Sequence, residues 1–206
     1  MKIVQSNAKL RATMNKLLAK EGNRALKNAS KRIKRRVKHI FYDAINDCPE
    51  ILELSGFDGK LRKDFGLSSD PTPEIIDDIV DSAFVEVKRI TSSGGTFKGG
   101  LTVGLHPSAY ANLLGLPQAS QLTEKGVLLP WLEWLLFKGD QIIVQNYGVE
   151  YGAGFGRSGG ARMSEDEPPF KVDPRYAGTV ESNFITRAII PFMPAINRVV
   201  KEELTR

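Results

Sequence analysis

The stretch that decides the fold is residues 7–46, NAKLRATMNKLLAKEGNRALKNASKRIKRRVKHIFYDAIN. Its apolar residues recur mostly at steps of three and four, which is the period of an amphipathic helix. They are Leu10, Met14, Leu17, Leu18, Ala25, Leu26, Ala29, Ile33, Val37, Ile40, Phe41, Ala44 and Ile45. Gly22-Asn23 interrupts this pattern, so we expect a bend or a split there. Cys48-Pro49 ends the helix, because a residue before proline is pushed out of the helical region.

The expected helix is long for a chain of 206 residues. Forty helical residues extend about 60 Å. A compact domain of this size cannot cover such a rod on its own, so part of the rod should project or pack on another subunit. We therefore expect a basic helical arm at 1–48 and an α+β body at 49–206, within one domain overall.

Charge is divided unevenly along the chain. Residues 1–39 contain 13 Lys/Arg and a single acid, Glu21, whereas the remaining residues hold 16 Lys/Arg and 23 Asp/Glu. A basic arm on an acidic body suggests two kinds of partner. The arm meets either nucleic acid or an acidic protein surface, including that of another copy of the chain.

The rest of the chain alternates short helices, strands and glycine-rich loops. Helical patterns and helix-starting prolines predict short helices at 73–81, 108–114 and 129–137, and a C-terminal helix from about residue 180 that Pro191 and Pro194 interrupt. Alternating apolar residues predict strands at 85–90, 101–105 and 141–151, with a short strand near Phe65. Glycines mark loops at 52–67, 92–100 and 152–169. We expect an α+β fold with a long N-terminal helix and a small, mostly antiparallel β-sheet, packed by short helices and a C-terminal helix.

Composition excludes several classes of protein. The single cysteine, Cys48, cannot form a disulfide within the chain, and assembly in a reducing cytoplasm is expected. The first residues carry neither a long apolar run nor a cleavage site of small residues. Uninterrupted apolar stretches stay well below 18 residues, so no membrane span or membrane partner is expected.

Residues 154–159, Gly-Phe-Gly-Arg-Ser-Gly, match the dinucleotide pattern G-x-G-x-x-G after an expected strand. That motif needs a helix directly afterwards, so that the pyrophosphate sits on the helix N-terminus. Here Ser164 begins the run Ser-Glu-Asp-Glu-Pro-Pro, in which prolines oppose a long helix and acids repel phosphate. We expect a flexible loop that carries Arg157 and Arg162, and no cofactor.

No group of residues marks a catalytic or metal site. His39 and His106 lie far apart, and neither has a cysteine or histidine at ligand spacing. Asp77, Asp78 and Asp81 could pair for acid–base chemistry, but a solvated helix face is the more usual role of such a run. We therefore expect no catalytic, cofactor-binding or metal-binding residues.

Two features could serve either the core or a partner. Trp131 and Trp134 lie three residues apart on one helical face in the densest apolar block, which favours the core over a subunit contact. The basic stretch 27–38 could track a phosphate backbone, since its cations recur along a helix. A solvated face, or pairing with the acids of a neighbour, fits that stretch as well.

Four segments, in this order, resemble the neck and tail-completion proteins of tailed bacteriophages. They are the basic helix running into 59–67 (GKLRKDFGL), 129–144 (LPWLEWLLFKGDQIIV), 156–163 (GRSGGARM), and 177–188 with Ala-Gly-Thr followed by Asn-Phe-Ile-Thr-Arg-Ala. Each segment is short, and their order and spacing carry the resemblance. The chain departs from the family pattern at Phe170-Lys171-Val172-Asp173 and at the prolines after Ile190.

This resemblance implies a structural virion protein without catalytic residues. Such a protein forms a ring, a hexamer or dodecamer, that joins the DNA-filled head to the tail through repeated surface complementarity. The implied partners are further copies of the chain and the adjacent head-connector and tail proteins, with passing genomic DNA as a secondary, non-specific contact. Virion assembly would take place in the host cytoplasm. The alternative is a non-specific nucleic-acid-binding protein that uses the basic N-terminal helix.

We expect a defined set of side chains to contact subunits or partners. They are Lys27, Lys31, Lys34, Arg35, Lys38, Arg62, Trp131, Trp134, Arg157, Arg162 and Arg187.

Overall fold

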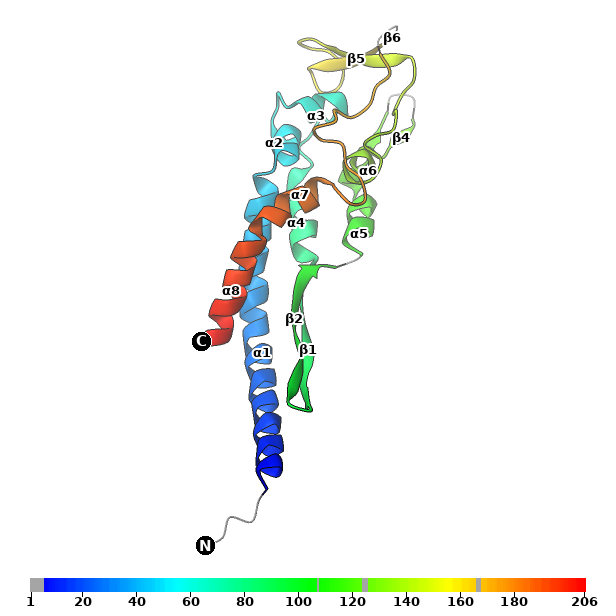
Figure 1. Ribbon diagram of the computed structural model, residues 1–206. Helices are drawn as coiled ribbons and strands as arrows, with labels where there is room; N and C mark the ends of the chain where they lie inside the picture. The colour runs from blue at the N-terminus through cyan, green and yellow to red at the C-terminus, as the bar shows by residue number, and fades with distance from the viewer. Residues whose placement is uncertain (1–5, 107, 124–125, 166–167) are drawn as a thin grey trace.

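Helix α1 (Asn7–Asn46) is the longest element of the computed structural model, which describes residues 6–106, 108–123, 126–165 and 168–206 (Figure 1). Ser6 caps its first turn, where its hydroxyl oxygen accepts a hydrogen bond from the backbone N–H of Lys9 at 3.4 Å. The helix ends before Pro49, which starts the next one. The predicted bounds of α1 are therefore confirmed, but the helix is continuous and is not split at Gly22-Asn23.

Gly22 and Asn23 instead form a docking point for the β-hairpin that lies along α1. The Asn23 amide donates to the carbonyl oxygen of Ile90 at 2.9 Å and accepts from the Ile90 N–H at 2.7 Å. A Cβ at position 22 would lie 2.9 Å from the Ile90 side chain, so glycine permits this close approach. The strand register is irregular between Lys88 and Thr91, and Asn23 serves there as the hydrogen-bond partner of the Ile90 backbone.

Three elements form an elongated shaft: α1, the antiparallel hairpin of β1 (Ala83–Ser93) and β2 (Thr96–Leu105), and α8 (Met193–Thr205). Figure 1 shows the hairpin and α8 alongside α1, and both contact it. Their shared core consists of Ala29, Ile33, Val37, Phe41, Ala83 and Ile196. One face of α1 is therefore buried by segments that lie far from it in sequence.

The remaining elements form a head at the C-terminal end of α1 (Figure 1). They are α2 (Pro49–Ser55), α3 (Lys60–Asp64), α4 (Thr72–Asp81), α5 (Ala109–Gly115), the 3₁₀ turn η1 (Pro117–Ala119), β3 (Gln121–Leu122), β4 (Leu128–Leu129), α6 (Trp131–Leu136), β5 (Tyr147–Tyr151), β6 (Ala161–Glu165), α7 (Phe184–Ile189) and the 3₁₀ turn η2 (Ile190–Phe192). A larger apolar core fills the head and includes Ile45, Leu61, Ile75, Trp131 and Phe184. The head core meets the shaft core through the last turns of α1.

The predicted α+β class is confirmed, with a long N-terminal helix and a C-terminal helix. Among the described residues, the strands form three separate two-stranded antiparallel sheets, β1–β2, β3–β4 and β5–β6. The short helices predicted at 73–81, 108–114 and 129–137 are present with small shifts of their ends. The hairpin predicted from 85–90 and 101–105 is present and longer than expected.

Other local predictions are wrong. No strand forms near Phe65, because α3 buries Leu61 and Phe65 together at helical spacing. In the predicted strand 141–151 only Tyr147–Tyr151 is extended in a ladder, and its partner β6 lies in the predicted loop 152–169. The C-terminal helical region begins later than residue 180, after Asn183, which forms a capping box with Thr186.

We expect Asn23→Ala to loosen the hairpin from α1 without breaking the helix. The substitution removes both hydrogen bonds to the Ile90 backbone at a half-buried site, and the loss should be about 1–3 kcal/mol of unfolding free energy. Denaturant unfolding measures the stability, and amide hydrogen exchange over 86–98 locates the change. Asn28→Ala, on an exposed part of α1, is the control. Unchanged exchange in the hairpin would contradict the docking role of Asn23.

Candidate functional site

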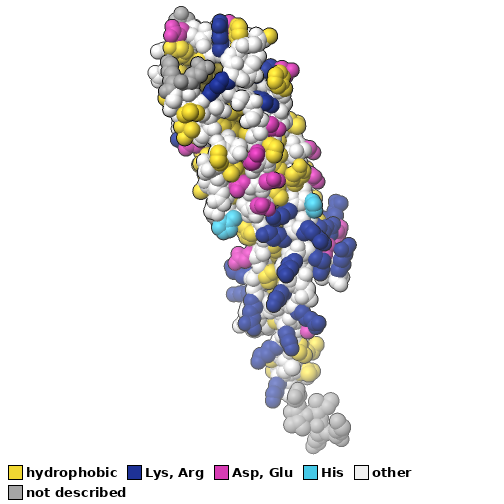
Figure 2. Space-filling model, turned by 180° about the vertical axis from the view of Figure 1, so that it is seen from behind, with side chains coloured by type: hydrophobic (Ala, Val, Ile, Leu, Met, Phe, Trp, Pro, Cys, Tyr) yellow, Lys and Arg dark blue, Asp and Glu magenta, His cyan; other side chains and the backbone are white. Residues whose placement is uncertain are grey.

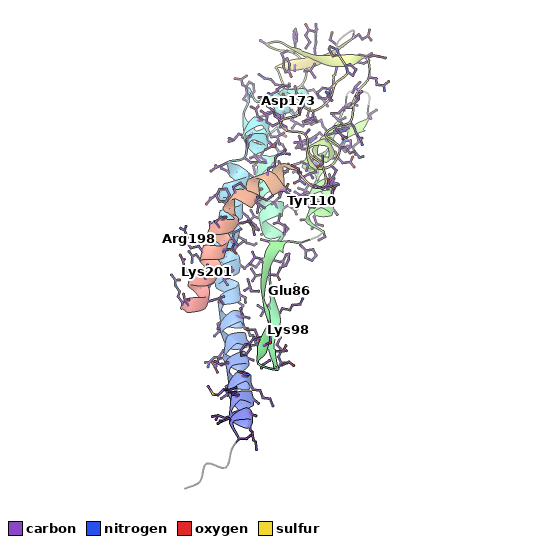
Figure 3. The ribbon with its side chains drawn as sticks, in the orientation of Figure 1. Glu86, Lys98, Tyr110, Asp173, Arg198 and Lys201 are labelled. Atoms are coloured by element: carbon purple, nitrogen blue, oxygen red, sulfur yellow. The ribbon has the colours of Figure 1, made fainter. Side chains whose placement is uncertain are left out.

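Positive charge gathers on the shaft. Residues 7–38, 83–105 and 193–206 hold 18 Lys/Arg and 4 Asp/Glu, whereas 39–82 and 106–192 hold 10 Lys/Arg and 20 Asp/Glu. Figure 2 shows one face of the molecule on which Lys and Arg side chains cover the shaft and Asp and Glu side chains gather over the head. Figure 3 shows further shaft cations, Lys98 on the hairpin and Arg198 and Lys201 on α8. The molecule is therefore strongly polarised along its length.

Four lysines of α1 form what we call the basic stripe: Lys27, Lys31, Lys34 and Lys38. At the helical turn per residue they lie within about 60° of one another around α1. Lys27, Lys31 and Lys34 are exposed, and in the described part of the chain none of them lies within ion-pair distance of a carboxylate, and neither does the neighbouring Arg35. Lys38 pairs with Asp81 of α4 at 2.7 Å. The structure thus places these five residues at the surface of the shaft, with Lys38 partly buried, and their contact with a partner remains a prediction.

Arg32 and Arg36 belong to the same basic stretch but face the opposite way, onto α8. Arg32 Nε donates to Glu203 at 2.6 Å and Arg36 donates to the same carboxylate at 3.0 Å. Arg206 adds a third contact at 3.1 Å, and Arg36 also pairs with Glu202. The hydrogen bond from Arg32 and that from Arg36 hold the pKa of the buried Glu203 below its ordinary value, although burial opposes the shift. This network fastens α8 to α1.

The first turns of α1 carry an apolar tip: Leu10, Met14, Leu17 and Leu18. Each of these side chains is at least half exposed. Burial of α1 begins only at Ala19, and α8 covers the helix further along, where Glu203 meets Arg32 and Arg36. The projection expected for part of the arm is therefore present, and the apolar tip is the part that the described chain leaves uncovered.

Two predicted contact residues in the head make hydrogen bonds within the chain. Arg62 donates to the carbonyl oxygens of Ser55, Leu67 and Ser68 and thereby ties α2 to the segment after α3. Arg187 donates to the buried Glu50 at 2.6 Å and to three carbonyl oxygens of the segment before α7. Both arginines organise the head, and contact with a partner remains a prediction for them.

The two tryptophans differ in exposure. Trp131 is fully buried, stacks near Phe65 with ring centroids 5.5 Å apart, and donates from its indole nitrogen to the carbonyl oxygen of Gln118 at 2.9 Å. Trp134 is half-buried and packs against the edge of the same core. Trp131 is thus a core residue, and a subunit contact remains a prediction for the exposed part of Trp134.

The glycine-rich motif at 154–159 is the turn between β5 and β6. Strand β6 follows it, so the segment lacks the helix N-terminus on which a pyrophosphate would rest. Arg162 pairs with Glu150 across the hairpin at 2.9 Å and lies over the Phe155 ring at 4.2 Å, and Arg157 donates to the carbonyl oxygen of Leu122. Both arginines are exposed at the far end of the head.

Sequence reasoning missed a cluster formed by Lys60, Asp64 and Tyr151 beside a cavity of about 220 Å³. Buried Asp64 accepts hydrogen bonds from Tyr151 and from Lys60, the latter at 2.9 Å. Burial lowers the pKa of Lys60, but its hydrogen bonds to Asp64 and Tyr151 outweigh burial, so the pKa is raised overall. Burial and the hydrogen bond to Asp64 raise the pKa of Tyr151. The hydrogen bonds among Lys60, Asp64 and Tyr151 attach β5 to α3.

Comparisons with known proteins do not assign the chain to a family. No family model, curated protein or solved structure matches the chain. In the ranges that the structure describes, no helix is long and apolar enough to cross a membrane. Those same ranges contain no group of three or more His, Cys, Asp or Glu side chains placed to hold a metal ion. The charged shaft, the apolar tip and the framework of the head are therefore the features that bear on function.

We expect Glu203→Gln to weaken the attachment of α8 most strongly at neutral pH. Because the folded-state pKa of Glu203 is lowered, its stabilisation is present above the unfolded-state pKa and is lost as the pH falls through the lowered folded value. The melting temperature of the variant should lie below that of the parent at pH 7 and converge with it at acidic pH. Thermal unfolding from pH 7 to pH 3 measures both. A constant difference across this range would contradict the charged role of Glu203.

Replacement of the two tryptophans should separate core from surface. Trp131→Ala removes a fully buried side chain and should cost about 3–5 kcal/mol of unfolding free energy. Trp134→Ala should cost clearly less, because its side chain is already partly in water. Chemical denaturation of both variants measures the difference. Equal losses would mean that Trp134 carries core packing that its exposure does not suggest.

Proposed function

We propose that the chain is a structural subunit of the neck of a tailed bacteriophage, in a tail-completion or tail-terminator role. It forms a ring, a hexamer or dodecamer, between the head connector and the tail. The observation that carries this proposal is the uncovered part of α1. Four apolar side chains at its tip, and three lysines of the basic stripe that have no ion-pair partner among the described residues, lie on a rigid rod. A rod with such surfaces is suited to contacts with neighbours that symmetry repeats.

The placement of the segments that resemble neck proteins also supports a structural role. Gly160 lies against the Lys63 side chain, which brings the segments 59–67 and 156–163 together in the head. The Gly139 N–H donates to the Gly178 carbonyl oxygen at 3.0 Å, and the Gly178 N–H donates to that of Trp134 at 3.2 Å. A Cβ at position 178 would collide with the backbone of α6, so these segments form a close-packed framework.

The partners and location follow from this role. Copies of the chain meet one another around the ring, and the adjacent head-connector and tail proteins contact its two faces. The protein resides in the virion after assembly in the host cytoplasm. Genomic DNA that passes through the ring is a non-specific contact, since residues 27–38 contain no aromatic side chain on which a base could stack.

The second candidate function is non-specific binding of nucleic acid by the basic N-terminal helix. The basic stripe favours it, because its four lysines extend over about 16 Å of α1 and could follow a phosphate backbone. A pure nucleic-acid function leaves the apolar tip without a role, and for that reason we place it second.

Imaging of phage particles tests the proposed function. A tagged copy of the chain should locate at the neck, in a ring of six or twelve copies in averaged particle images. Loss of the chain should leave filled heads that do not join tails. A location on the tail tip or capsid shell, or normal joining without the chain, would reject the proposal.

A salt series separates the two candidate functions. The purified protein should associate with itself without DNA, and duplex DNA should be released at physiological salt. Strong DNA binding at that salt, with a steep salt dependence that Lys27→Glu removes, would favour the nucleic-acid function instead.

A further inference from the structure

The basic stripe ends where an acidic surface begins, on the same side of the molecule. The Lys38–Asp81 ion pair joins them, since Lys38 is the last residue of the stripe and Asp81 is the last residue of α4. Glu74 and Asp77 continue from Asp81 along the exposed face of α4. We call Glu74, Asp77 and Asp81 the acidic stripe. Figure 2 shows such a succession of basic and acidic side chains on one face.

Both stripes are electrostatically unfavourable in an isolated chain. Lys27 and Lys31 are four residues apart on α1, and so are Lys34 and Lys38, a spacing at which like charges on a helix repel. Glu74 and Asp77 lie three residues apart on α4, and Asp77 and Asp81 four apart. Within the described chain, Lys38–Asp81 is the single ion pair that links the two stripes.

Asp78 adds a further carboxylate to α4 beside the acidic stripe. Its Oδ2 atom is buried without a hydrogen-bond partner in the described chain. Burial is the main cause that raises the pKa of Asp78, and the charge of Asp81 adds to it, so these carboxylates repel one another although Lys38 pairs with Asp81. A cation brought by another molecule would relieve this repulsion.

We propose that two copies of the chain pair antiparallel through this face, with the basic stripe of each copy on the acidic stripe of the other. Opposite charges in line on one face become complementary when a second copy is turned by a two-fold axis near the Lys38–Asp81 boundary. Such an isologous contact uses the same patch on both copies and closes at two. The same stripe could meet nucleic acid, but that partner would leave the acidic stripe uncompensated.

This pairing does not depend on the proposed function. It describes the free chain before any ring is formed, and in this state the lysines of the basic stripe are covered by protein. Ring formation on a head connector would then exchange the two-fold contact for contacts with ring neighbours. A failed neck proposal would leave the pairing intact, and a failed pairing would leave the ring proposal intact.

Three double variants test the pairing by light scattering after gel filtration. Lys27→Glu/Lys31→Glu inverts the basic stripe, and Glu74→Lys/Asp77→Lys inverts the acidic stripe. The matched control Arg198→Glu/Lys201→Glu changes the same amount of charge on exposed cations of α8, away from this face. Circular dichroism checks that each variant keeps its helices and its cooperative unfolding.

The parent chain and the control should have twice the single-chain mass of 22.8 kDa at low salt, and dissociate as salt rises. Each stripe variant alone should weaken pairing at least tenfold. A one-to-one mixture of the two stripe variants should restore pairs, and so should the quadruple variant that carries both inversions.

Other outcomes overturn the pairing. A parent chain that remains single at low salt rejects it outright, and a parent chain that forms larger rings replaces it with the ring contact. Unchanged mass in both stripe variants, together with lost retention on duplex DNA, would assign the basic stripe to nucleic acid. Failure of the mixture to pair would show that the two stripes do not meet.

Discussion

The burial of one face of α1 is the constraint on which the rest of the structure depends. A helix of 40 residues in water gains most of its stability from the packing of its apolar face. The β1–β2 hairpin and α8 provide that packing from Ala19 onward, and the head closes over the last turns. The apolar tip stays exposed because neither the hairpin nor α8 extends to it. The lengths of these two elements therefore decide which surface of α1 is left for partners.

Polar contacts between residues far apart in the sequence decide where α8 and the hairpin lie on α1. Glu203 is held by Arg32 and Arg36, and Ile90 is held by Asn23. Apolar packing is non-directional and would allow a cover to slide along the helix. A carboxylate between two guanidinium groups, or an amide matched to one peptide unit, fixes a single register. The shaft therefore combines an adaptable apolar seam with two polar contacts that set its geometry.

Local signals in the sequence were sufficient for α1, α4 and the hairpin, because periodicity and capping act within one element. The segment 52–67 and strand β6 were missed, because tertiary packing of Leu61 and pairing with β5 determine them. The role of Asn23 was misjudged, since its partner lies 67 residues away. Arg32 and Arg36 each lie three residues after a buried residue of α1, and the structure places both at the contact with α8. The buried carboxylate that meets them, Glu203, carries no local signal of its own.

Because α1 is rigid, the opposite charges of the shaft and the head stay apart and remain available to partners. The shaft and the head carry opposite net charge, and a flexible linker would let one fold back on the other. The continuous helix α1 prevents this, because it holds Lys27 and Lys31 away from the acids of its own head while it passes through both regions. Among the described residues, Lys38, at the boundary, is the one cation of the stripe that pairs with a head carboxylate. Neutralisation of the stripe must therefore come from small ions or from another molecule, and a surface at fixed spacing on a rigid rod favours a partner with an equally fixed array of carboxylates.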